Sequence, residues 1–172
     1  MPGSVLLYLV RHAIAEERGE AWPDDRLRPL TEQGRARMER QVQGLAALGV
    51  QVDAILTSPL VRTRQTADIL LHGLRGRPEV IDWEPLEPER RPKDVLTGLK
   101  AYREYTSLAI VGHEPGIGDL AAALIAARHP IGFKKGAVAL IETPMLPPAA
   151  GAGELRWFLT PRIRRRVART KS

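Results

Sequence analysis

Two arginines and two histidines stand where their side chains could act together. Each follows a short apolar run of the chain, and they are Arg11, His12, Arg62 and His113. Neutral imidazole is nucleophilic at cellular pH and can bond covalently to phosphorus. Guanidinium groups match the oxygens of a phosphoryl group in charge and geometry. If the apolar runs are neighbouring strands, the sequence predicts a phosphate site that contains a nucleophile.

The apolar runs have the composition of buried strands. They comprise residues 5–10, 54–57, 108–111 and, with a weaker pattern, 80–83. Helical patterns lie between them, and alternating strands and helices form right-handed crossovers around a largely parallel sheet. Ligands of such sheets bind beyond the carboxyl ends of the strands. We therefore expect an α/β three-layer sandwich that brings the four side chains to one edge.

The predicted helices cover residues 31–48, 59–71, 92–102 and 116–127, and two closing strands are expected at 137–142 and 155–159. In the first helix Thr31 is the N-cap, and Met38, Val42, Leu45 and Leu48 form an apolar face. The charged connection 13–30 is predicted to be a flap over the strand ends, and the loop 143–154 to be mobile. The final helix is expected to end before His129 and Pro130.

The net charge of +6 is concentrated at the end of the sequence. There are 26 basic and 20 acidic residues, and six of the basic ones lie in the last eleven positions: Arg162, Arg164, Arg165, Arg166, Arg169 and Lys171. We predict one domain over 1–161 and a basic tail over 162–172. The tail could contact nucleic acid, membrane or an acidic protein, or be a solvated terminus. Because no aromatic residue separates its arginines, nucleic acid is not the expected partner.

Several functional classes do not fit the composition. The sequence has no cysteine and no histidine or carboxylate cluster with metal-ligand spacing, so we expect neither a metal nor another cofactor. Its apolar stretches are shorter than the roughly 18 residues of a membrane span, and no signal peptide is evident. A cytoplasmic protein without membrane attachment is expected.

Four motifs follow one another in the sequence: Leu9-Val10-Arg11-His12-Ala13, Arg28-Pro29-Leu30-Thr31 with Gly34, Ser58-Pro59 with Arg62, Gln65 and Thr66, and Gly112-His113-Glu114-Pro115. In order, residue type and strand context they resemble the histidine phosphatase superfamily, which has an RHG-like motif after the first strand and a late GH. The short length and the second and third motifs are similar to SixA-type phosphohistidine phosphatases. The resemblance spans residues 6–160 and implies a phosphoglycerate mutase-like fold.

The resemblance also implies roles for individual residues. His12 would be the nucleophile, Arg11 and Arg62 would clamp the phosphoryl oxygens, and a protonated His113 would donate to the same oxygens. Arg28 could reach the substrate from the flap, although a plain surface arginine is an equal alternative. Gly112 could allow close approach of the substrate, or a tight strand exit could equally require glycine.

Two departures from the family pattern bear on the chemistry. Ala13 replaces the usual glycine and adds only a methyl group. No acidic residue has a spacing that identifies it as the general acid for an alkoxide leaving group. The candidates are Glu84, Glu87 and Glu89 after the predicted strand 80–83, and Glu16 and Glu17 on the flap. Arg64 is expected to face solvent, and Ser58 and Thr66 to cap and pack.

These expectations favour a phosphatase that acts through a phosphohistidine intermediate on a phosphohistidine protein. Imidazole leaves readily once its other nitrogen is protonated, and a protein substrate needs an open site without an inserted cap. The alternative is a phosphatase for small phosphoesters or phosphoanhydrides. A mutase is less expected, because the RHGxSxWN-like continuation is absent. From another class, the protein could be an anion-binding module with an inert pocket.

Overall fold

A six-stranded sheet forms the middle layer of the protein. The computed structural model describes residues 3–161, and the six basic residues of the tail lie outside this range. The strands are β1 (Val5–Arg11), β2 (Ala54–Thr57), β3 (Glu79–Asp82), β4 (Ser107–Gly112), β5 (Val138–Thr143) and β6 (Glu154–Leu159). They are ordered β3-β2-β4-β1-β5-β6. The first four are parallel, whereas β5 and β6 run antiparallel. The predicted, mostly parallel sheet is confirmed.

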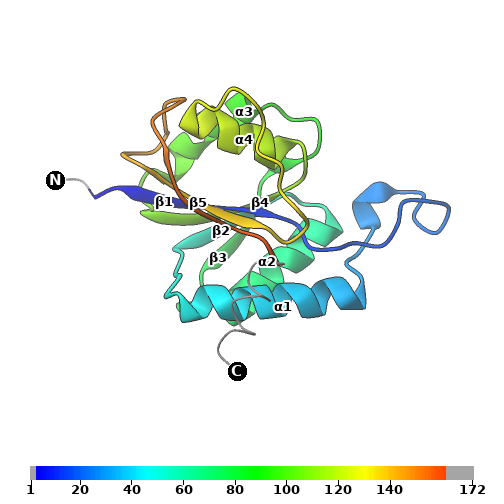
Figure 1. Ribbon diagram of the computed structural model, residues 1–172. Helices are drawn as coiled ribbons and strands as arrows, with labels where there is room; N and C mark the ends of the chain where they lie inside the picture. Colours follow the sequence, from blue (N-terminus) through cyan, green and yellow to red (C-terminus); the bar gives the residue numbers. More distant parts are fainter. Residues whose placement is uncertain (1–2, 162–172) are drawn as a thin grey trace.

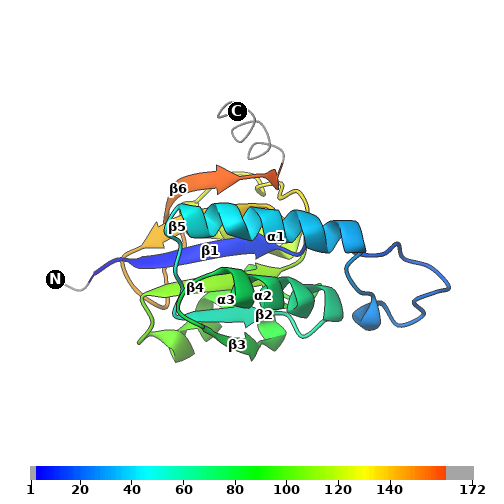
Figure 2. The same cartoon turned by 90° about the horizontal axis from the view of Figure 1, so that it is seen from below.

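Helices cover both faces of this sheet, as Figures 1 and 2 show. On one face lie α1 (Glu32–Ala47) and α2 (Val61–Gly73); on the other lie α3 (Pro92–Gly98) and α4 (Gly116–Ile125). Alternate residues of β1 belong to the two cores: Leu7 and Leu9 join the α3 and α4 side, and Tyr8 and Val10 the α1 and α2 side. The predicted three-layer sandwich is therefore present.

Three details differ from the sequence-based expectation. Leu48 is 65% exposed because α1 ends at Ala47 and the chain turns through Gly49, which has a φ of +78°. The helix α4 ends at Ile125, since Ala126 adopts a left-handed conformation with a φ of 53°. The expected helix 92–102 is α3 followed by the 3₁₀ segment η3 (Leu99–Tyr102).

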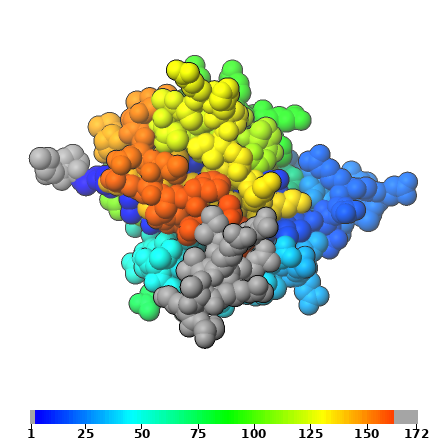
Figure 3. All heavy atoms as spheres, in the orientation of Figure 1, coloured from blue at the N-terminus to red at the C-terminus, as the bar shows by residue number. Residues whose placement is uncertain are grey.

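The connection between β1 and α1 forms a flap at the carboxyl end of β1. Its two arms meet in an antiparallel bridge between Ala15 and Leu30, and Thr31 N donates to Ile14 O at 3.0 Å. Thr31 also accepts a hydrogen bond from Gly34 N at 2.9 Å, as predicted for the N-cap of α1. A Cβ at Gly34 would lie 2.1 Å from Ile14 O, so only glycine permits this approach. Figure 3 shows the flap, in blue, as a lobe that projects from one end of the molecule.

Within residues 3–161, no helix is both long enough and apolar enough to cross a lipid bilayer.

Candidate active site

The ends of three adjacent parallel strands bring the predicted side chains together. Arg11 pairs with Gly112 across β1 and β4, and Thr57 pairs with Val111 across β2 and β4. The following residues continue this ladder, because His12 N donates to Gly112 O and Ser58 N donates to Val111 O, both at 3.1 Å. The carboxyl edge of the sheet thus fixes the backbone beneath both histidines.

A cavity of about 350 Å³ lies at this edge. Its lining includes the four predicted side chains, Arg11, His12, Arg62 and His113, the two further candidates Arg28 and Glu16, and also Arg18, Lys135 and Glu114. No group of three or more histidine, cysteine or carboxylate side chains within residues 3–161 could hold a metal ion. Basic side chains and imidazoles outnumber the carboxylates of Glu16, Glu17 and Glu114 in the lining of the cavity, an arrangement that suits an anion.

His12 is buried and has the geometry of a nucleophile. Its Nδ1 lies 2.7 Å from the carbonyl oxygen of Ala13, so Nδ1 must carry the proton, and Nε2 keeps its lone pair. Burial lowers the pKa of His12 to about 3, and the charges of Arg62 and Arg11 act in the same direction, against the hydrogen bond to Ala13. The imidazole is consequently neutral near pH 7.

Three buried nitrogens around His12 have no hydrogen-bond partner in the described part of the chain. They are Nε of Arg11, Nε of Arg62 and Nδ1 of His113. Both guanidiniums are otherwise held firmly: Arg11 Nη1 donates to Phe133 O at 2.6 Å, and Arg62 donates through Nη1 and Nη2 to the flap. Buried donors are rarely left unpaired because this costs free energy. The arrangement suits an oxyanion that accepts from several nitrogens at once.

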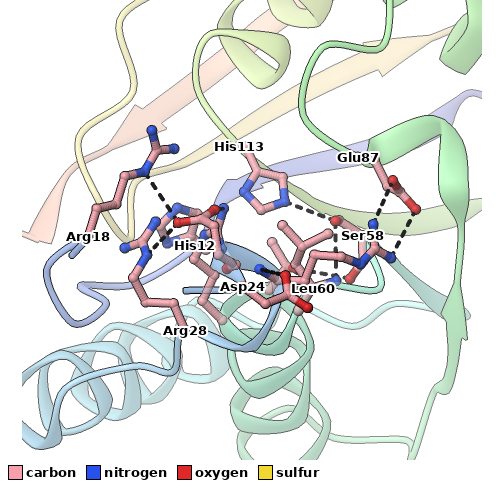
Figure 4. Close-up of polar contacts among 12 residues, drawn as sticks. His12, Arg18, Asp24, Arg28, Ser58, Leu60, Glu87 and His113 are labelled. Carbon is pink, nitrogen blue, oxygen red and sulfur yellow. Dashed lines mark hydrogen bonds and ion pairs between the residues drawn. The ribbon is translucent and has the colours of Figure 1, made fainter. Parts of the chain in front are cut away.

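His113 is neutral in the free protein, whereas the sequence analysis expected it to be protonated. Burial lowers its pKa to about 2, with His12 and Arg62 adding to the effect, so His113 is neutral in the free protein. Its anionic surroundings would arise only with a bound phosphoryl group. Figure 4 shows His113 between His12 and Ser58; the two imidazole centroids are 5.3 Å apart.

Contact with Ser58 allows His113 to donate a hydrogen bond while its imidazole is neutral. The Ser58 hydroxyl lies 2.9 Å from His113 Nε2 and accepts a long hydrogen bond of 3.5 Å from Leu60 N. A hydroxyl that donates to Nε2 leaves the imidazole proton on Nδ1, the nitrogen that has no partner. The expected capping of α2 by Ser58 is not found, because the N-cap is Leu60 and no side chain caps this helix. Thr66 packs as expected, accepting from Ala13 N and donating to Arg62 O.

Asp25 is the site residue that the sequence analysis missed. It begins the 3₁₀ turn η1 (Asp25–Leu27) of the flap. Its carboxylate accepts from Arg28 Nε at 2.8 Å and Arg62 Nη2 at 2.9 Å and pairs with Arg18 at 3.3 Å. Its carbonyl accepts from Arg62 Nη1 at 2.8 Å. The sequence holds no signal for this role, because the burial of Arg28 and Arg62, which makes a charged partner necessary, is seen only in the structure.

Arg28 lies in the site rather than on the surface. It is buried and lines the cavity, and its Nη1 donates to Glu16 O at 2.7 Å, which ties the two arms of the flap together.

The acidic candidates for a proton donor are scattered. Glu16 lines the cavity with His12, whereas Glu87 pairs with Arg26 at 3.2 Å and lines a smaller neighbouring cavity. Glu84 is exposed in the 3₁₀ turn η2 (Glu84–Leu86). Of the five candidates, the two flap glutamates, Glu16 and Glu17, line the main cavity, whereas Glu84, Glu87 and the exposed Glu89 do not.

Gly112 contacts the site through its backbone, and Arg64 does not line the cavity. A Cβ at Gly112 would make ordinary contacts with Ile117, and its carbonyl accepts from His12 N. Arg64 pairs with Asp82 and Asp68 and is partly exposed.

Comparisons with known proteins show which family and fold this chain resembles. The family profile of the histidine phosphatase superfamily (branch 1) matches residues 7–88. An uncharacterized protein of Picosynechococcus is 36% identical over 137 residues, covering 77% of this chain and 81% of that protein. The phosphohistidine phosphatase SixA homolog of Haemophilus influenzae is 29% identical over 144 residues, covering 77% and 85%. The structure of the protein histidine phosphatase SixA complexed with tungstate superposes with a TM-score of 0.82 at 24% identity, covering 92% and 99%. This last likeness shows a common fold.

The contacts of Asp25 lead to a prediction about stability. Replacing Asp25 with Asn leaves the side chain of Arg62, which is 2% exposed, without its charged partner. The free energy of unfolding should fall by about 1 to 3 kcal/mol in urea titrations at pH 7, toward the lower value because the Asp25 side chain is 39% exposed. The matched control is Asp24→Asn, whose side chain keeps an oxygen to accept from Arg26 N. Equal losses in both variants would contradict the argument.

The same pair should give stability a defined pH dependence. Partial burial opposes ionisation of Asp25, yet the hydrogen bond from Arg28 and the nearby guanidinium charges lower its pKa. A group with a lowered folded-state pKa stabilises the protein above its ordinary pKa and loses this effect as pH falls through the lowered value. The difference between wild type and Asp25→Asn should therefore shrink in strongly acidic buffer.

Proposed function

Because the chain belongs to the histidine phosphatase superfamily and is a phosphatase, we propose that it hydrolyses phosphohistidine on a protein through a covalent intermediate on His12. The observation that carries the proposal is the neutral His12 surrounded by unpaired buried nitrogens of Arg11, Arg62 and His113. These groups supply a nucleophile and oxyanion donors in one cavity. Phosphoryl transfer requires mainly such positioning and charge stabilisation.

The reaction would proceed in two balanced steps. First, the lone pair of His12 Nε2 forms a bond to phosphorus while the bond from phosphorus to the substrate imidazole breaks; because the other nitrogen of that imidazole carries a proton, it departs as neutral imidazole. Then water attacks phosphorus, the bond between phosphorus and Nε2 breaks, and both hydrogens of the water leave with inorganic phosphate as H₂PO₄⁻, which returns His12 to its neutral form. Arg11 and Arg62 would hold the oxygens throughout, and His113 Nδ1 would add a third donor.

The leaving group favours phosphohistidine as the substrate. The first step exchanges one phosphorus-bound imidazole for another, so it needs little help from an acid of the protein. This agrees with a site in which Glu87 is engaged by Arg26. The flap is the longest connection near the site and leaves the exposed Arg18 at the mouth of the cavity. A protein-borne side chain could therefore reach His12.

Glu114 supports a second candidate, hydrolysis of small phosphoesters. It lines the cavity, and burial raises its pKa, so its protonated form is more accessible than that of an ordinary glutamate. An alkoxide leaving group requires such a donor. However, its Oε1 accepts from Phe133 N at 3.3 Å, which holds the carboxylate against the backbone.

A cytoplasmic location and the exclusion of nucleic acid as a partner stay predictions.

Trapping of the intermediate tests the mechanism. Brief exposure of the wild-type protein to a ³²P-labelled phosphohistidine donor should label the protein with a base-stable, acid-labile phosphoryl group. His12→Ala should carry no label, because its methyl side chain cannot bond to phosphorus. A wild type that remains unlabelled with several donors, or a labelled His12→Ala, would exclude the covalent route.

Comparison of substrates tests the proposed substrate class. Hydrolysis of a phosphohistidine protein should exceed hydrolysis of a panel of small phosphoesters in kcat/KM, by about a hundredfold for poor alkoxide leaving groups. Glu114→Gln should leave the phosphohistidine reaction nearly unchanged. A preference for esters, together with loss of ester turnover in Glu114→Gln, would instead establish the small-molecule function.

A further inference from the structure

Lys135 is a cationic side chain that lines the cavity but lies outside the four family motifs. It lies in the connection between α4 and β5, and it lines the same cavity as His12, Arg11 and Arg28. Lys135 is an exposed residue, whereas the Nε atoms of Arg11 and Arg62 are buried. Lys135 therefore approaches the cavity from its open side.

Hydrogen bonds join the backbone around Lys135 to Arg11 and His12. Gly136 N donates to Arg11 O at 3.2 Å and to His12 O at 3.1 Å. On the other side, Phe133 O accepts from Arg11 Nη1 at 2.6 Å, and Lys134 O accepts from Ala137 N at 2.8 Å. In Figure 1 this connection, in yellow, descends to the carboxyl end of β1. Three of these hydrogen bonds join the connection to Arg11 and His12, and the fourth closes a turn around Lys135, so the position of the Lys135 backbone relative to His12 is fixed.

The charge of Lys135 is not matched by a fixed anion. Arg18, Arg28 and Arg62 share Asp25, whereas none of the ion pairs within residues 3–161 includes Lys135. Burial lowers the pKa of Lys135, and Arg11 and Arg28 add to this effect, with Glu17 opposing it. Glu16, Glu17 and Glu114 line the same cavity, but none of them is ion-paired with Lys135. The cations there repel one another, and a bound anion would relieve this repulsion.

We propose that Lys135 is a further phosphoryl-binding residue, whose ammonium group contacts the phosphoryl oxygens from the open side of the cavity. This inference rests on the proposed function, because it assumes that the phosphoryl group binds beside His12. Arg11, Arg62 and His113 would hold the group from the buried side, and Lys135 would complete the set of donors at the mouth. A flexible ammonium suits this place, since it can follow the group as it moves between substrate and His12.

Binding of inorganic phosphate to the full chain tests this role apart from turnover. Lys135→Met removes the charge but keeps much of the length of the side chain, and Lys135→Arg keeps the charge. The control is Lys134→Met, which removes a charge from the adjacent exposed residue, one that does not line the cavity. Calorimetry would give the Kd of phosphate for each variant, and thermal melting would show that each is folded.

The expected result is a Kd about tenfold higher in Lys135→Met, with Lys134→Met and Lys135→Arg within threefold of the wild type. The KM for a phosphorylated substrate should rise in parallel, which a purely structural role would not produce in a folded variant. A rise below threefold in Lys135→Met, an equal rise in Lys134→Met, or no recovery in Lys135→Arg would overturn the proposal. A wild type that binds no phosphate would instead refute the proposed function itself.

Discussion

The buried guanidinium of Arg62 imposes the constraint on which the site depends. A charge removed from water is costly unless it is paired and hydrogen-bonded. Here the carboxylate and the carbonyl of Asp25 accept from both terminal nitrogens of Arg62, and the same carboxylate holds Arg28. The flap is thereby fixed over the strand ends, and Nε of Arg62 stays unpaired. In the proposed function, stability and anion binding would use different nitrogens of the Arg62 side chain.

The neutrality of the two imidazoles follows mainly from their burial, and nearby charge adds to it. Burial and nearby cations lower the pKa values of His12 and His113, so the free site holds a nucleophile rather than an imidazolium. A phosphoryl dianion would offset the cations and favour protonation of His113 once bound. In the proposed function, the same set of cations would help to keep both imidazoles neutral in the free protein and attract the phosphoryl group of the substrate. Ser58 contacts His113 Nε2 in the free protein.

Much of this organisation was predictable from the sequence, because it follows from local patterns. Apolar runs indicated the parallel strands, and the residues just after them had to meet at one edge; His12 and His113 do so. The roles of Asp25, Ser58 and Lys135 could not be derived this way. Each depends on where a flap or a connection returns in space, and their spacing along the chain carries no periodic signal. The exposed Leu48 shows the same limit, because helical periodicity does not fix where a helix ends.

The central claim is that the unpaired buried nitrogens around His12 receive a phosphoryl group. A crystal structure of this protein with tungstate, located by its anomalous signal, tests the claim most directly. The account predicts one tungstate beside His12 Nε2, within hydrogen-bond distance of Nε of Arg11, Nε of Arg62 and Nδ1 of His113. Tungstate bound elsewhere, with these nitrogens still unpaired, would contradict it.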